Sequence, residues 1–376
     1  MIKVTGNNTG LLEKFGLYYL GRFSIRQPHH HPFDQTDEEL VLKVRKISRK
    51  GIFLSAVVGI LTVFPIVWLD VHFANAGFWT HYGILVAAIL SFTLIEFYLL
   101  FLISLKAVHE VSAIINMQAR EKDYLDGLFG VKNILARTAL EIPDPELTIL
   151  GIDPFKRISK KNLFVLSLIY KGKIILTNVI LKLLLTLTTG PTLLGIPIAW
   201  EALLVEAFWN GVVIKRVVME ARLRLFGYAL AEEITETVIN EGTIFQLSPE
   251  ARIGCLRSIG NAVVMTQNYH PNMIILLLHF ADLLHISEEN RYDDWDLFLE
   301  TLTKLPENER FFLLDLFTVA AAFDGKLSKL EQENLRAAYQ KEYDLYLPRL
   351  QKLTQCLKGG RLNEAYGLCR LDYVAG

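Results

Sequence analysis

Apolar residues are concentrated in four stretches within the first 225 positions of the chain. A helix needs roughly 20 mainly apolar residues to cross the hydrocarbon core of a bilayer. The stretches that approach this length are residues 52–69, 82–105, 174–189 and 192–214. We expect the first two to span a membrane, because Glu96 is the only charged residue in either of them. The last two contain charges and turn residues, so they form either two further spans or a re-entrant hairpin.

Basic residues flank these stretches on one side only. Five Lys and Arg residues lie within residues 43–50, before the first stretch, and others follow the second and fourth stretches. Residues 70–81 and the Gly190–Pro191 turn contain none. Lys and Arg accumulate in cytoplasmic loops. The sequence therefore predicts a four-span protein of a bacterial inner membrane, with both termini and the loop of residues 106–173 in the cytoplasm.

The pattern changes to that of water-soluble amphipathic helices after residue 225. Ser248 and Pro249 stand at the positions expected for the start of a helix. Residues 271–286 are apolar nearly all round and predict a central core helix. No alternation typical of strands competes, so the predicted fold is all-α. Its parts are a cytoplasmic N-terminal segment (1–51), a transmembrane region (52–225) and a cytoplasmic helical domain (226–376).

Charge and cysteine content agree with this division. The net charge of −1 combines 25 Lys and Arg against 18 Asp and Glu in residues 1–225 with 14 against 22 in the remainder. The basic residues lie beside apolar runs rather than among exposed aromatic residues, so the expected partner is the lipid bilayer and not nucleic acid. Three cysteines, all after residue 225 and without a C-x-x-C spacing, indicate reduced thiols.

One short stretch of the soluble half resembles a known family. Residues 316–339, LFTVAAAFDGKLSKLEQENLRAAY, contain an Ala-rich helix that ends in Asp-Gly and is followed by a hydrophobic and then an acidic position. The stretch is similar to the tellurite-resistance TerB-like domain, a small helical bundle. The resemblance implies a link with stress and membrane-associated assemblies and, for some members, with metal. The matching residues are Ala321, Ala322, Asp324, Gly325, Leu327 and Glu331; Phe323 stands where a smaller residue is common.

The residues of this motif have a local structural interpretation. Gly325 can adopt a positive φ and end the helix, while Asp324 can accept backbone N–H groups in the turn. The alternative is a divalent-cation site that uses Asp324 and Glu331. Calcium, however, requires six to eight oxygen ligands, and the loop lacks the alternating acidic residues of an EF-hand.

A second weak metal candidate lies near the N-terminus. His29, His30 and His31 are adjacent in a loop bracketed by prolines. Neighbouring residues in such a loop point in different directions, so we expect a solvated segment and no bound cofactor. The chain contains no phosphate-binding, dinucleotide-binding, zinc-protease or nucleophile-elbow motif in the required context. An enzymatic function is therefore not expected.

Charged residues inside the apolar stretches are the remaining candidates. They are Glu96, Lys182, Glu201 and Glu206. A charge at this depth is costly and indicates either a structural pair or a transport path. A hairpin about the Gly190–Pro191 turn would bring Lys182 within a turn of Glu201, and its depth would let it pair with Glu201 or with Glu96. Three acids against one base leave an excess that is protonated, hydrated or bound.

Two functions follow from these patterns. The first is a non-enzymatic inner-membrane protein whose helical domain docks a cytoplasmic protein partner or senses stress, and which forms homo-oligomers. The second is an oligomeric channel or transporter for protons, cations or a small solute, in which the four intramembrane charges line the path. Enzymatic action on a lipid is a third, less favoured interpretation.

Overall fold

The computed structural model describes residues 11–23, 31–116, 131–140, 151–152, 195–266, 270–286, 291–327 and 329–369. Nearly all of these residues are helical and none forms a β-strand, which confirms the all-α prediction. The chain divides into two compact units. We call the described part of Arg45–Ala107 and Ile158–Val218 the three-helix unit, and the described part of Met1–Val44, Val108–Arg157 and Met219–Gly376 the bundle unit.

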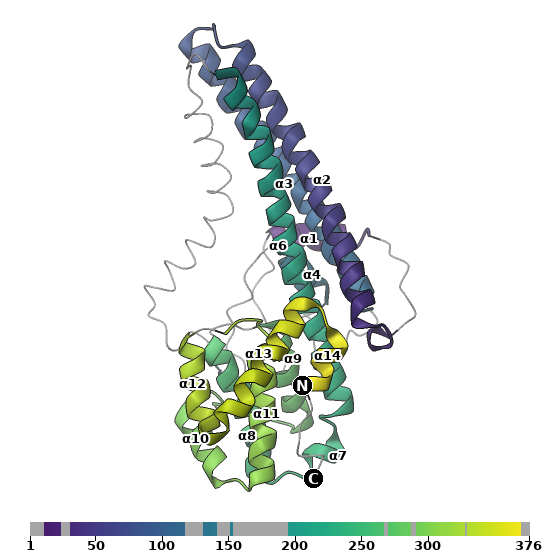
Figure 1. Cartoon of the computed structure of the whole chain (residues 1–376), viewed down its shortest axis with the longest axis vertical. Helices are drawn as coiled ribbons and strands as arrows, with labels where there is room; N and C mark the ends of the chain where they lie inside the picture. Colours follow the sequence, from purple (N-terminus) through teal and green to yellow (C-terminus); the bar gives the residue numbers. More distant parts are fainter. Residues whose placement is uncertain are drawn as a thin grey trace. The chain divides into compact units, whose positions relative to one another are not determined.

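Three long helices, side by side, form the three-helix unit (Figure 1). They belong to α2 (Asp37–His72), α3 (Phe78–Ile114) and α6 (Gly195–Thr237). Helix α2 starts with Asp37, Glu38 and Glu39, whose charges favour a helix N-terminus. It continues through Pro65 without a break. A short turn around Asn75 then reverses the chain into α3.

Helices α2 and α3 are long and apolar enough to cross a bilayer. At most a third of the most apolar segment of each helix is buried, unlike the core helix of a soluble protein. Two of the four predicted spans, residues 52–69 and 82–105, therefore lie on helices of the required length. The predicted span at residues 174–189 lies outside the described residues. The span at residues 192–214 falls largely within α6, whose described part starts at residue 195.

Small residues allow α2 and α6 to approach each other closely. Gly51, Ser55 and Gly59 recur every four residues on α2, and such a pattern lets membrane helices pack backbone against backbone. A Cβ atom on Gly59 would lie 3.2 Å from the backbone nitrogen of Ala207 on α6. A Cβ atom on Gly51 would lie 2.8 Å from Cγ2 of Ile214. Residue numbers fall on α2 as they rise on α6, so the two helices are antiparallel.

The core of the bundle unit is built from the helices that follow α6. Ser248 Oγ accepts the N–H of Ala251 at 3.2 Å and so caps α8 (Pro249–Thr266), as predicted from the sequence. Helix α8 packs closely on α11 (Glu307–Ala322), where a Cβ atom on Gly254 would meet the side chain of Leu313. The helices are α7 (Glu241–Ile244), α8 (Pro249–Thr266), α9 (Pro271–Leu283), α10 (Trp295–Lys304), α11 (Glu307–Ala322), α12 (Lys329–Tyr339), η4 (Gln340–Glu342), α13 (Tyr343–Gly359) and α14 (Leu362–Leu368).

Segments from the N-terminal half of the chain also belong to the bundle unit. Helix α1 (Leu11–Leu20) joins α4 (Val131–Ala139) through a buried ion pair of 2.9 Å between Glu13 and Arg137. After the short helix η1 (Pro32–Asp34), the carboxylate of Asp37 accepts the backbone N–H groups of Asn363 at 2.8 Å and Glu364 at 3.0 Å. This long-range cap ties the start of α2 to α14. The expected boundary after residue 225 falls inside α6, which continues to Thr237.

Replacing Gly59 by alanine should destabilise the protein. The added Cβ would lie 2.7 Å from Asn210 Nδ2 and 3.2 Å from backbone atoms of α6, so the helices must separate. Overpacking of this kind costs about 1–3 kcal/mol. Gly83→Ala on α3 is the matched control, because a Cβ there meets nothing within 4 Å. Thermal unfolding of the purified full chain in detergent measures both, and equal effects of the two changes would contradict the described packing.

Candidate functional site

A buried carboxylate with a neutral partner lies inside the three-helix unit. The side chain of Glu96 on α3 is 2% exposed, and its Oε1 accepts a hydrogen bond of 2.6 Å from Nδ2 of Asn210 on α6. Asn210 is fully buried. Asn210 is thus an uncharged hydrogen-bond donor to Glu96.

Further polar groups are buried on the same three helices. Glu206 lies one helical turn before Asn210 on α6 and is 1% exposed. On α2, Gly59 contacts Asn210, and Thr62 donates its hydroxyl to the carbonyl of Val58 at 3.0 Å. Thr93 of α3 is also buried. The three helices thus direct their polar side chains inward.

The structure describes the side chains of two of the four predicted intramembrane charges. Glu96 and Glu206 are buried in the three-helix unit, on α3 and α6. Lys182 and the side chain of Glu201 lie outside the described residues. The partner that the structure gives to Glu96 is Asn210, which sequence reasoning missed. Its only signal was position, since Asn210 follows Glu206 by four residues and so shares its helix face.

The Asp324–Gly325 turn has the geometry expected from its residues. Helix α11 ends at Ala322, and Gly325 has a φ of +70°. Oδ1 of Asp324 accepts the backbone N–H of Lys326 at 2.8 Å. Asp324 and Glu331 are both buried, at 4% exposure each. The local interpretation of these residues, a glycine-ended helix with an aspartate in the turn, is therefore confirmed.

This turn packs directly on α6. A Cβ atom on Gly325 would lie 2.8 Å from Cδ2 of Leu223. At a second left-handed glycine, Gly360 (φ +76°), a Cβ atom would lie 2.8 Å from Cδ of Arg222. Nδ2 of Asn272 on α9 donates to the carbonyls of Leu223 at 3.4 Å and Phe323 at 3.5 Å. Two glycine turns and one amide therefore hold the segment of α6 around Leu223.

Burial controls the protonation of the groups near this contact. Burial raises the pKa of Asp324 to about 7, and the nearby charge of Glu331 raises it further. The hydrogen bond from the backbone N–H of Lys326 and the positive charges of Lys326 and Lys358 act in the opposite direction. His270, at the start of α9, has a pKa well below its usual value because of burial and the neighbouring charges of Arg224 and Lys326. Its imidazole is therefore neutral at physiological pH.

Other candidate chemistry finds less support among the described residues. No group of three or more His, Cys, Asp or Glu side chains there is arranged to hold a metal ion. His31 lies 3.4 Å from the carboxylate of Glu233, whereas His29 and His30 are outside the described residues. The three cysteines are free and buried, and burial raises their pKa values, to about 11 for Cys356 and about 12 for Cys369. Thiols of this kind are poor nucleophiles.

Comparison of the chain with protein families, with curated proteins and with solved structures finds no match. The functional interpretation therefore depends on the chemistry of these residues.

Stability of the bundle unit should fall as the pH rises toward 7. The folded pKa of Asp324, about 7, lies above the ordinary value of 3.8, so the folded state binds a proton that the unfolded state lacks. The stabilisation is complete below pH 3.8 and is lost as the pH passes through 7, with a slope of up to about 1.4 kcal/mol per pH unit. Asp324→Asn keeps the acceptor for Lys326 but not the charge, so it should remove this slope.

Denaturant unfolding between pH 4 and pH 8 tests this expectation. The control is Glu333→Gln, which removes one acidic charge at an exposed position of α12. A slope that persists in Asp324→Asn, or that disappears equally in the control, would show that Asp324 is not responsible.

Proposed function

We propose that this protein is a non-enzymatic, multi-span protein of a bacterial inner membrane whose helical bundle docks a cytoplasmic partner or senses stress. The observation that carries the proposal is that α6 contributes to both units. Its residues up to Val218 belong to the three-helix unit, and its residues from Met219 belong to the bundle unit. One continuous helix thus connects the three-helix unit, whose outer surface is apolar, to the part of the bundle unit that packs against the Asp324–Gly325 turn.

The side-chain distribution of the three-helix unit supports the membrane location. Its outer surface is apolar, with exposures of 68% for Phe53, 86% for Trp79, 71% for Leu94 and 72% for Phe208. Its interior holds the polar side chains of Glu96, Asn210 and Glu206. Soluble proteins rarely expose contiguous apolar surface of this extent. Aromatic residues at the α2–α3 turn, which are Trp68, Phe78, Trp79 and Tyr82, fit the interfacial belt of a membrane protein.

The packing around Leu223 supports a docking or sensing role for the bundle unit. A partner that moved the Asp324–Gly325 turn would press on Leu223, because no space separates the two residues. Close-packed interiors transmit such displacements rather than absorbing them. The resemblance to the TerB-like domain is consistent with this role. We expect homo-oligomers and a cytoplasmic protein partner.

A channel or transporter for protons, cations or a small solute is the second candidate. The observation that favours it is the burial of two carboxylates, Glu96 and Glu206, between apolar helices. Ionisable residues in such positions often line proton or ion paths. The hydrogen bond from Asn210 to Glu96 favours the structural role instead, because it satisfies the carboxylate with a fixed partner.

A double-mutant cycle separates these two roles of Glu96. Asn210→Leu should destabilise the protein by about 1–3 kcal/mol, because it removes a hydrogen-bond donor from a buried carboxylate. The double change with Glu96→Leu should recover most of this loss. Thermal unfolding in detergent measures the stability, and a proton- or cation-flux assay in liposomes measures transport. Flux above that of empty liposomes in the wild type, abolished by Glu96→Gln in a folded protein, would favour the transporter.

Thiol labelling tests the orientation. The native cysteines are buried, so a membrane-impermeant maleimide should react only with introduced ones. In intact spheroplasts, Asn75→Cys in the turn between α2 and α3 should be labelled, whereas Leu345→Cys on α13 should be labelled only after lysis. Both positions are exposed. Labelling of Leu345→Cys in intact cells would place the bundle unit outside and contradict the proposal.

The same position serves to test docking. A photo-cross-linker at Leu345, an apolar side chain that is 67% exposed, should capture one discrete protein in living cells. The control is a cross-linker at Lys304, which is also exposed but lies in an ion pair with Glu300 on α10. Capture at neither position would argue against a docking function for this surface.

A further inference from the structure

Seven basic residues surround one end of the three-helix unit. All of them are exposed, and they come from all three helices: Arg45, Lys46, Arg49 and Lys50 of α2, Lys106 of α3, and Lys215 and Arg216 of α6. We call this set the basic collar. No acidic residue occurs on α2 between Arg45 and Asp70, so the collar is a region of uniformly positive charge on that helix.

The packing of the helices brings the collar residues to one level. Gly51 of α2 faces Ile214 of α6, which places Lys50 beside Lys215 along the unit. Helices α3 and α6 run in the same direction past the bond between Glu96 and Asn210 (Figure 1). Lys106 therefore lies beyond this bond at the same end as Arg216. Residues far apart in the sequence thus form one ring.

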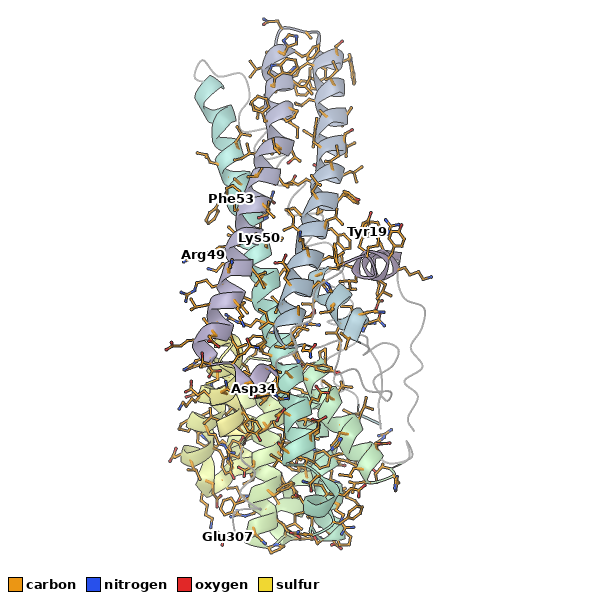
Figure 2. The ribbon with its side chains drawn as sticks, turned by 90° about the vertical axis from the view of Figure 1, so that its right-hand side faces the viewer. Tyr19, Asp34, Arg49, Lys50, Phe53 and Glu307 are labelled. Carbon is orange, nitrogen blue, oxygen red and sulfur yellow. The ribbon has the colours of Figure 1, made fainter. Side chains whose placement is uncertain are left out.

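The collar borders directly on the apolar surface. Arg49 and Phe53 are one helical turn apart and project from the same outer side of α2 (Figure 2). Beyond Phe53, the exposed large side chains of this helix are apolar, among them Leu54, Ile60, Leu61 and Phe64. Lys and Arg at such a border extend their charged ends toward the lipid headgroups and keep their carbon stems against apolar surface.

We propose that the basic collar binds the phosphate groups of anionic phospholipids in the leaflet that faces this end of the helices. The inference rests on the membrane location in the proposed function. Guanidinium groups bind phosphate through two parallel hydrogen bonds, and ammonium groups bind it as point charges. Each Lys or Arg near an anionic leaflet raises the binding constant by about five-fold. Seven such residues in one ring give a strong preference for anionic over zwitterionic lipid.

A lipid-preference measurement on the full chain tests the proposal. The protein is reconstituted in nanodiscs of phosphatidylcholine mixed with phosphatidylglycerol, and lipids that remain bound after extraction are counted by native mass spectrometry. The test variant carries Lys46→Gln, Arg49→Gln, Lys215→Gln and Arg216→Gln. The control carries Lys304→Gln, Arg336→Gln, Lys341→Gln and Lys352→Gln, which remove the same charge from exposed positions of the bundle unit.

The wild type and the control should retain phosphatidylglycerol in preference to phosphatidylcholine. In the test variant, the ratio of bound phosphatidylglycerol to bound phosphatidylcholine should fall by about ten-fold or more. Equal preference in all three proteins would overturn the proposal. The proposal would also be overturned if soluble glycerophosphoglycerol protected the wild type from thermal unfolding as well as phosphatidylglycerol does. That result would identify a site for the free headgroup. If the test variant does not fold, the pair Lys46→Gln and Arg49→Gln replaces it, with Lys304→Gln and Lys341→Gln as control.

The membrane location is tested separately by washing cell membranes with alkaline carbonate. A wild type that is released by the wash would contradict the proposed function itself. A wild type that is retained but shows no lipid preference would contradict the collar alone.

Discussion

The three-helix unit depends on how a buried carboxylate is satisfied. Glu96 is almost completely buried between apolar helices, and an unpaired charge in such surroundings is costly. Asn210 of α6 donates to it, so α3 and α6 must keep the register that brings these two side chains within hydrogen-bond distance. Gly59 of α2 lies so close to Asn210 that a Cβ atom there would be 2.7 Å from Nδ2. The hydrogen bond between α3 and α6 thus lies against α2, and a shift of α3 or α6 along the other would break it.

Large apolar side chains of α6 are exposed in the three-helix unit and buried in the bundle unit. In the three-helix unit its Leu204 and Phe208 are exposed while Glu206 and Asn210 are buried. In the bundle unit its Leu225 and Phe226 are completely buried. The proposed membrane location would account for this reversal, because hydrocarbon tails and a protein core are both apolar. The single continuous helix therefore needs no break where its surroundings change.

Local patterns predicted much of this fold, and long-range partners could not be predicted. Ser248 and Gly325 were assigned correctly because a cap and a left-handed turn depend on neighbouring residues. The bond of Glu96 to Asn210 and the cap of α14 by Asp37 join residues that are 114 and 326 positions apart, and local patterns do not identify such pairs. The same reason explains why the segment before the first span was not assigned to the bundle unit.

The two left-handed glycines have a role beyond ending helices. Gly325 and Gly360 belong to different turns, yet each lies against neighbouring residues of α6, Leu223 and Arg222. A side chain at either glycine would have to displace side chains of α6 as well as adopt a strained backbone. Asp324 directly precedes the first of these glycines and is itself buried, and this burial raises its pKa to about 7. The left-handed turn and the buried carboxyl group are therefore neighbours in the segment that packs on α6, so a change in the turn would alter both the packing and the protonation of Asp324.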